Sequence, residues 1–112
     1  MYKVIFHVNE INKTKLALNN IKNLIVDLGE ESLQVELLAN SDGVNMLLKT
    51  AVQYEDLIKE LHSKKVTFAA CANAMKAMGI AKESLFDFAI VVPSGVGELV
   101  KKQSEGYAYI KP

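Results

Sequence analysis

The chain has 112 residues, enough for one domain with a single hydrophobic core. Half of the residues are hydrophobic and 23% are charged, which is typical of a globular protein and excludes a disordered one. The 13 basic residues, all lysine, balance 13 acidic ones, so charge gives no reason to expect a nucleic acid or an anionic membrane as partner.

The N-terminus begins directly with a strand pattern, without a charged leader and a following apolar run. No stretch approaches the ~18 apolar residues that span a bilayer. We therefore expect a cytoplasmic protein with no membrane partner. The single cysteine cannot form an intrachain disulfide.

The first half of the chain alternates between strand and helix patterns. Residues 2–8 predict a buried strand, and a helix follows, with Asn12 as its N-cap and an apolar face over residues 17–28. A second strand is predicted at residues 33–38, then a short helical piece, and then a helix over residues 54–62.

The second half continues the alternation. A strand at residues 66–70 leads directly into a helix at 72–78. A fully apolar strand at 88–92 precedes a helix at 95–104 that presents Val96, Leu99 and Val100 inward, and residues 107–110 predict a terminal strand. The pattern predicts one α/β domain over residues 1–112, with a mainly parallel five-stranded sheet between two helical layers.

Cys71 lies at the junction between the third strand and its helix. Ligands and reactive groups collect at the carboxyl ends of the strands in open α/β sheets. A thiol at this junction faces free N–H groups of the helix, which favour its thiolate. The alternative is an inert, buried structural thiol, because free cysteine is among the most buried residue types.

Two turns and one histidine are predicted at the same edge of the sheet. The turn that follows the second strand contains Asn40 and Gly43, and the turn that follows the fourth contains Ser94 and Gly95. His7 lies near the C-terminal end of the first strand and is a candidate auxiliary group, although a packed strand histidine is the simpler interpretation. No zinc set, dinucleotide fingerprint or phosphate loop is present, so we expect neither metal nor cofactor.

The chain resembles the DsrE/DsrF-like (YchN-like) family over nearly its full length. Four segments carry the resemblance: Asn20–Leu24, Phe68–Asn73, the Ser94–Val96 turn with Glu98 and Leu99, and the ending Gly106–Pro112. The resemblance implies a flavodoxin-like three-layer fold and homo-oligomers such as dimers, trimers or hexamers. It adds Asn73, beside the matching cysteine, to the expected pocket.

In the best understood relatives, the cysteine that matches Cys71 carries sulfane sulfur as a persulfide. The resemblance therefore implies a sulfur carrier that exchanges sulfur with donor and acceptor proteins, in sulfur oxidation or in tRNA thiolation. One alternative is an oligomeric binding or scaffold module with an inert Cys71, in which residues of the terminal strand close the interface. A small-molecule enzyme is a third alternative, but no acid–base pair in the sequence supports it.

Overall fold

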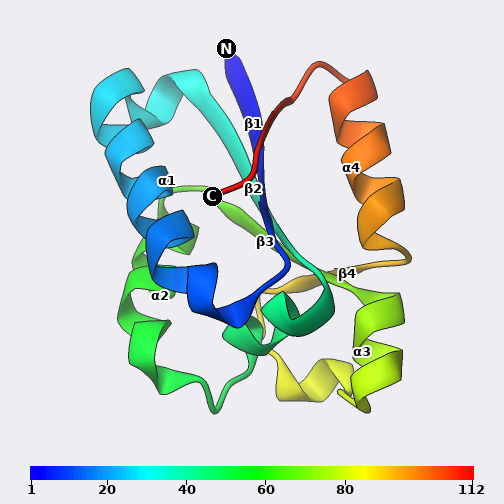
Figure 1. Ribbon diagram of the computed structural model, residues 1–112. Coiled ribbons are helices and arrows are strands. Elements are labelled where there is room, and N and C mark those ends of the chain that lie inside the picture. The colour runs from blue at the N-terminus through cyan, green and yellow to red at the C-terminus, as the bar shows by residue number, and fades with distance from the viewer.

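Five parallel strands form the central sheet of the computed structural model, which describes residues 1–112 (Figure 1). The strands, listed in chain order, are β1 (Tyr2–Val8), β2 (Leu33–Ala39), β3 (Thr67–Cys71), β4 (Ile90–Val92) and β5 (Ala108–Ile110). All neighbouring strands are parallel, in the order β4-β3-β2-β1-β5. The predicted α/β fold is confirmed. Its strand order differs from the 2-1-3-4-5 order of flavodoxin, because the last strand returns to pair with β1.

Four α-helices flank the sheet. They are α1 (Thr14–Leu28), α2 (Glu55–Ser63), α3 (Ala72–Met78) and α4 (Gly95–Ser104). Figure 1 shows α1 and α2 on one side of the sheet and α4 on the other, with α3 below α4. None of the helices has both the length and the apolar character needed to cross a bilayer.

The two faces of the sheet are covered unequally. On one face, β1 contributes Val4, Phe6 and Val8 to a core of 23 buried residues that α1 and α2 complete. On the other face, Leu99 of α4 belongs to a cluster of only five buried residues. On this second face, Gln34 of β2 and Ile90 of edge strand β4 remain exposed.

Helix α4 is rotated relative to the prediction. Leu99 is buried as expected, but Val96 and Val100 are 66% and 59% exposed. The first residue of α4, Gly95, is buried beside Cys71. Gly95 and Leu99 are one turn apart on the helix, so this row faces the protein and the row of Val96 and Val100 faces solvent. The predicted inward face was therefore wrong for these two valines.

Two other boundaries differ from the prediction. The fourth strand covers only Ile90–Val92, because Phe88 leaves the strand and stacks on the His62 ring at a centroid distance of 4.2 Å. This strand is an edge strand, and Ile90 is 44% exposed rather than fully buried. Asn12 does not cap α1 and lies instead in a short 3₁₀ turn that precedes it.

Candidate functional site

A cavity of about 470 Å³ opens at the carboxyl edge of the sheet, where α3 and α4 begin. Parallel strands bring their following loops together at this edge. The residues that line the cavity come from the turns after β2 and β4, from Cys71 and along α3, and from the start of α4: Asn40, Ser41, Asp42, Cys71, Asn73, Ala74, Ala77, Met78, Ser94, Gly95 and Val96.

The Sγ atom of Cys71 is held by two backbone N–H groups. Cys71 is the N-cap residue of α3, and its sulfur accepts a hydrogen bond from the Ala74 N–H at 3.4 Å. The N–H of Gly95, the first residue of α4, donates a second hydrogen bond at 3.2 Å. Cys71 is only 7% exposed, so the cavity is the route from solvent to its sulfur. Both N–H groups favour a negative charge on that sulfur.

Gly95 permits this close approach because it has no side chain. A Cβ atom at this position would lie 3.0 Å from the Cβ of Asn40 and 3.3 Å from the Cβ of Cys71. Any larger residue would push α4 away from the sulfur. The three residues therefore meet at one point, although they come from three different parts of the chain.

A chain of hydrogen bonds fixes the side chain of Asn40. Its Oδ1 lies 2.9 Å from the Nε2 of His7, and the Nδ1 of His7 lies 2.7 Å from the Tyr109 hydroxyl. Because Oδ1 can only accept, Nε2 of His7 donates this hydrogen bond. The Nδ2 of Asn40 is then directed toward Gly95, 3.1 Å from the position that a Cβ there would take. His7 thus reaches the cavity through Asn40.

The other predicted pocket residues have different positions. Asn73 lines the cavity from the exposed first turn of α3. Ser94 also lines it, and its Oγ accepts a hydrogen bond from the Gly97 N–H at 3.1 Å as the N-cap of α4. Gly43 does not line the cavity. It packs against β1, where a Cβ atom would lie 2.1 Å from the carbonyl oxygen of Val8.

Sequence reasoning missed Tyr109 and Met78 as residues of this site, and it placed Val96 on the buried face of its helix. Tyr109 reaches His7 because β5 pairs with β1, and a single sequence does not show this pairing. Met78 and Val96, 39% and 66% exposed, line the cavity. The sequence signal for Met78 and Val96 is that each is an apolar residue outside the buried face of its own helix, and exposed apolar residues often mark a binding surface.

The cavity carries almost no charge. Asp42 is its only charged residue, and both of its carboxylate oxygens lie within hydrogen-bond distance of nitrogen atoms, the backbone N of Ile11 and the Nδ2 of Asn45. No lysine lines the cavity. No group of three or more His, Cys, Asp or Glu side chains in the protein could hold a metal ion. The arrangement therefore suits chemistry at one sulfur atom.

Comparisons with known proteins agree with this fold. The DsrE/DsrF-like family model matches residues 3–112. A structure of a protein of unknown function from Methanobacterium thermoautotrophicum, MTH1491, is 39% identical with a TM-score of 0.93, over 100% of both chains. The ychN protein from E. coli is 19% identical with a TM-score of 0.76, again over 100% of both chains. At this identity the similarity shows a shared fold. No curated protein matches the chain. From the family match, the chain belongs to the DsrE/DsrF-like family.

Proposed function

We propose that this protein is a sulfur carrier that holds sulfane sulfur as a persulfide on Cys71 and passes it to the thiol of a partner protein. The observation that carries the proposal is the Cys71 sulfur, which two N–H groups hold at the end of a cavity. Membership of the DsrE/DsrF-like family, which suggests a role in sulfur relay, supports it.

The chemistry needs one thiol and no external oxidant. The Cys71 thiolate attacks the outer sulfur of a donor persulfide, a new S–S bond forms at Cys71, and the donor leaves as a thiolate. An acceptor thiolate then attacks the outer sulfur on Cys71 and displaces the Cys71 thiolate. The chain has no second cysteine to resolve the persulfide internally, so both exchanges need partner thiols.

Asn40 is suited to bind the outer sulfur of such a persulfide. The inner sulfur keeps the N–H groups of Ala74 and Gly95, and the outer one extends into the cavity. The Asn40 Nδ2 group beside Gly95 is a donor on that side, and the bond from His7 to Oδ1 fixes its orientation. Hydrogen-bond donors aimed at a charge that develops on sulfur stabilise it most in a site sheltered from water.

The low charge of the cavity favours a particular class of donor. A doubly charged anion such as thiosulfate finds no lysine among the lining residues and one carboxylate, that of Asp42. A persulfide on a protein or on a small neutral thiol does not bring a double negative charge next to the Asp42 carboxylate. The exposed apolar side chains of Met78 and Val96 also suit a donor or acceptor with an apolar segment around its cysteine.

The test is sulfur loading of the folded protein, followed by intact mass. After treatment with a small neutral alkyl persulfide, the protein is expected to gain the mass of one sulfur atom and to lose it to an added cysteine peptide. Cys71→Ser is the matched control, because serine is a good N-cap and preserves the start of α3. Thiosulfate is expected to load the protein more slowly than the alkyl persulfide. A wild-type protein that gains no sulfur while folded would refute the proposal.

A second candidate is an oligomeric binding or scaffold module with an inert Cys71. The observation that favours it is the 7% exposure of Cys71, together with Tyr109 and Ile110, which are 40% and 37% exposed on edge strand β5. It predicts that Cys71 reacts with iodoacetamide only after denaturation. It also predicts that Tyr109→Ser lowers the oligomeric state in sedimentation, whereas Cys71→Ser leaves it unchanged.

A further inference from the structure

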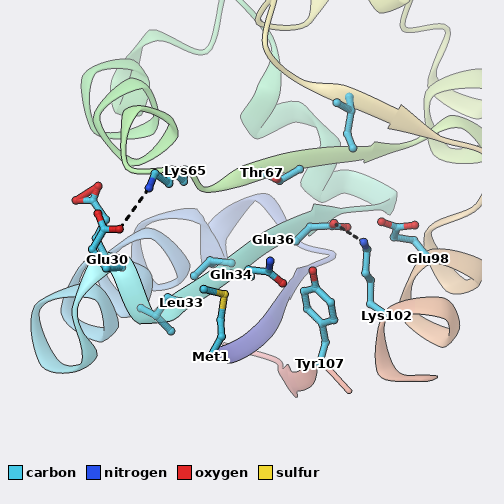
Figure 2. A pocket seen from close by; sticks show the side chains of 13 residues that line it. Met1, Glu30, Leu33, Gln34, Glu36, Lys65, Thr67, Glu98, Lys102 and Tyr107 are labelled. Carbon is cyan, nitrogen blue, oxygen red and sulfur yellow. Dashed lines mark ion pairs between the residues drawn. The ribbon is translucent and has the colours of Figure 1, made fainter. Parts of the chain in front are cut away.

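A second cavity lies beside α4, on the face of the sheet where the start of β2 is exposed, and it shares no lining residue with the cavity at Cys71. It has a volume of about 590 Å³. Figure 2 shows Glu30 at one end and Glu36 with Glu98 at the other, with Leu33, Gln34 and Met1 between them. None of these residues belongs to the site of Cys71.

Glu36 is the unusual residue in this cavity. It lies on β2, is 4% exposed, and faces the side of the sheet that α4 covers. With its carboxylate ionised, Oε2 is buried and has no hydrogen-bond partner. Burial above all, together with the hydrogen bond and the charge of the neighbouring Glu98, raises the pKa of the Glu36 carboxyl to about 8. When this carboxyl ionises, its buried Oε2 is therefore left without a donor.

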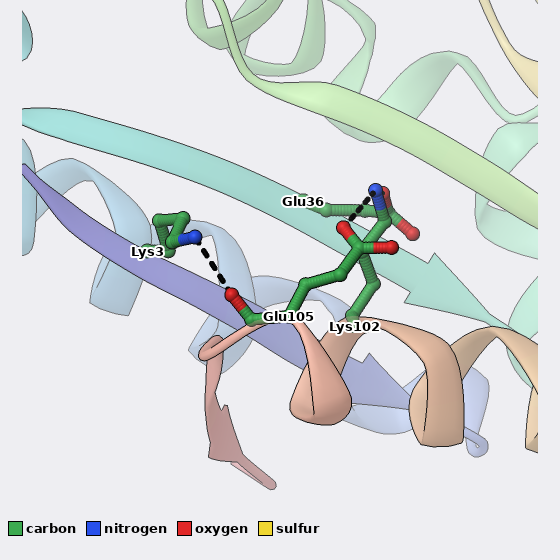
Figure 3. Close-up of polar contacts among 4 residues, drawn as sticks. All are labelled: Lys3, Glu36, Lys102 and Glu105. Carbon is green, nitrogen blue, oxygen red and sulfur yellow. Dashed lines mark hydrogen bonds and ion pairs between the residues drawn. The ribbon is translucent and has the colours of Figure 1, made fainter.

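The nearby lysines do not satisfy Glu36. Lys102 on α4 lies 3.9 Å from its Oε1 and 3.8 Å from Glu105, so its charge is divided between two carboxylates. Figure 3 shows Lys3 turned away to the Glu105 carbonyl oxygen, at 2.7 Å. Both lysines also lie over the Tyr107 ring, 5.0 and 5.6 Å from its centroid. No lysine is a hydrogen-bond partner of the buried Oε2.

The opposite end of the cavity is acidic as well. Glu30 and Glu31 form a short 3₁₀ turn before β2, and only Lys65 pairs with them, 3.7 Å from Glu31, with both of those side chains exposed. Along β2, Leu33 and Glu36 are roughly 10 Å apart, and Glu30 and Glu31 lie beyond Leu33 in the preceding turn. Apolar Leu33, Met1 and Ile90 lie among the lining residues.

We propose that this cavity binds an extended aliphatic polyamine, with one ammonium group between Glu36 and Glu98 and another at Glu30 and Glu31. The methylene chain lies over the apolar residues between the two ends. An ammonium group supplies the N–H donors that Oε2 of Glu36 lacks. The formal charge of the chain is zero, so general attraction for cations does not account for the site.

The experiment is calorimetric titration of the full chain with spermidine at pH 8.5, where its terminal amines stay charged. Saturable binding is expected, and putrescine and butylamine, which have fewer ammonium groups, should bind progressively more weakly. Glu36→Gln and Glu98→Gln should each weaken spermidine binding by about tenfold or more, since a charge-assisted hydrogen bond is lost. Glu83→Gln, in an exposed 3₁₀ turn that lies outside the cavity, is the matched control and should bind as the wild type does.

Proton release gives a second readout. The charged and titratable groups around Glu36 are Glu98 and Lys102 of α4, then Glu105 and Tyr107 beyond it. Binding at pH 7 should release a proton from the carboxyl pair, seen as a heat that changes with the ionisation enthalpy of the buffer. Glu36→Gln should lose that release. Equal affinity in the wild type and Glu36→Gln, or no saturation at millimolar spermidine, overturns the proposal. Cys71→Ser should bind spermidine normally, which separates this site from the carrier function.

Discussion

The backbone N–H of Gly95 donates a hydrogen bond to the Sγ of Cys71 at 3.2 Å, although the two residues are 24 positions apart. Cys71 ends β3 and Gly95 begins α4, so this bond joins the loops that follow two neighbouring strands. The bond adds the N-terminus of a ten-residue helix to the donor that α3 supplies. The electrostatic environment of the sulfur therefore depends on a tertiary contact as well as on the local strand-to-helix turn.

The first prediction concerns Gly95→Ala. The new Cβ would lie 3.0 to 3.3 Å from atoms of Asn40 and Cys71, so α4 or these side chains must move by a few tenths of an ångström, and we expect the hydrogen bond from the residue 95 N–H to the sulfur to lengthen. Crowding of this kind costs roughly 1–3 kcal/mol of unfolding free energy. Alkylation of the Cys71 thiol at neutral pH should also slow. Both are measured by chemical denaturation and by the rate of iodoacetamide modification.

Gly97→Ala is the control for this variant. Its Cβ would meet only Ser94, at an ordinary 3.5 Å, and alanine favours the helix by up to about 1 kcal/mol over glycine. Gly97→Ala should therefore be as stable as the wild type or more stable, with an unchanged alkylation rate. If both variants alkylate at the same rate, the Gly95 hydrogen bond does not influence the sulfur.

The second prediction concerns Asn40→Asp. This change replaces an amide donor near Gly95 with a carboxylate, whose charge repels a thiolate on Cys71. Alkylation and sulfur loading should slow severalfold at neutral pH, most strongly at low ionic strength because the repulsion is screened by salt. Asn12→Asp, in an exposed turn outside the cavity, makes the same chemical change and should leave both rates unchanged. Equal slowing in both variants would point to net charge rather than to Asn40.

The sequence predicted the features that depend on residues close together in the chain, and it failed for those that depend on contacts between distant residues. Strand β1 was predicted with its observed bounds, and Cys71 was placed correctly at a strand-to-helix junction, because both depend on neighbouring residues. The Gly95 and Tyr109 contacts depend on which strands pair, and that information is spread over the whole chain. The predicted orientation of α4 was wrong for the same reason. Gly95 packs against Asn40, in a turn far away in the sequence, and this contact turns the row of Gly95 and Leu99 toward the protein.

The third prediction tests that orientation. Leu99 lies in the small buried cluster between α4 and the sheet, so Leu99→Ala should cost about 2–4 kcal/mol of unfolding free energy. Val100→Ala is the matched control on the exposed row and should change stability by less than about 0.5 kcal/mol. Urea denaturation measures both. A larger loss in Val100→Ala than in Leu99→Ala would mean that α4 packs through the valine row.

The fourth prediction follows from the raised pKa of Glu36. Its carboxyl has a pKa of about 8 in the folded protein against 4.5 ordinarily, because burial and the neighbouring Glu98 disfavour the charged form. Between these two pH values the native state holds a proton that the unfolded state has released. Stability linked to Glu36 is therefore full below about pH 4.5, falls as pH rises to about 8, and is constant above it.

Glu36→Gln isolates this contribution, because glutamine keeps the shape of the side chain and does not titrate. Denaturation of both proteins at pH 5, 6.5, 8 and 9 should show the wild type losing stability relative to Glu36→Gln up to about pH 8, and no further change above it. Glu83→Gln, an exposed substitution, should keep the wild-type slope. A constant difference between the wild type and Glu36→Gln across this range would mean that Glu36 is already ionised in the folded protein, through a closer pairing with Lys102 than 3.9 Å.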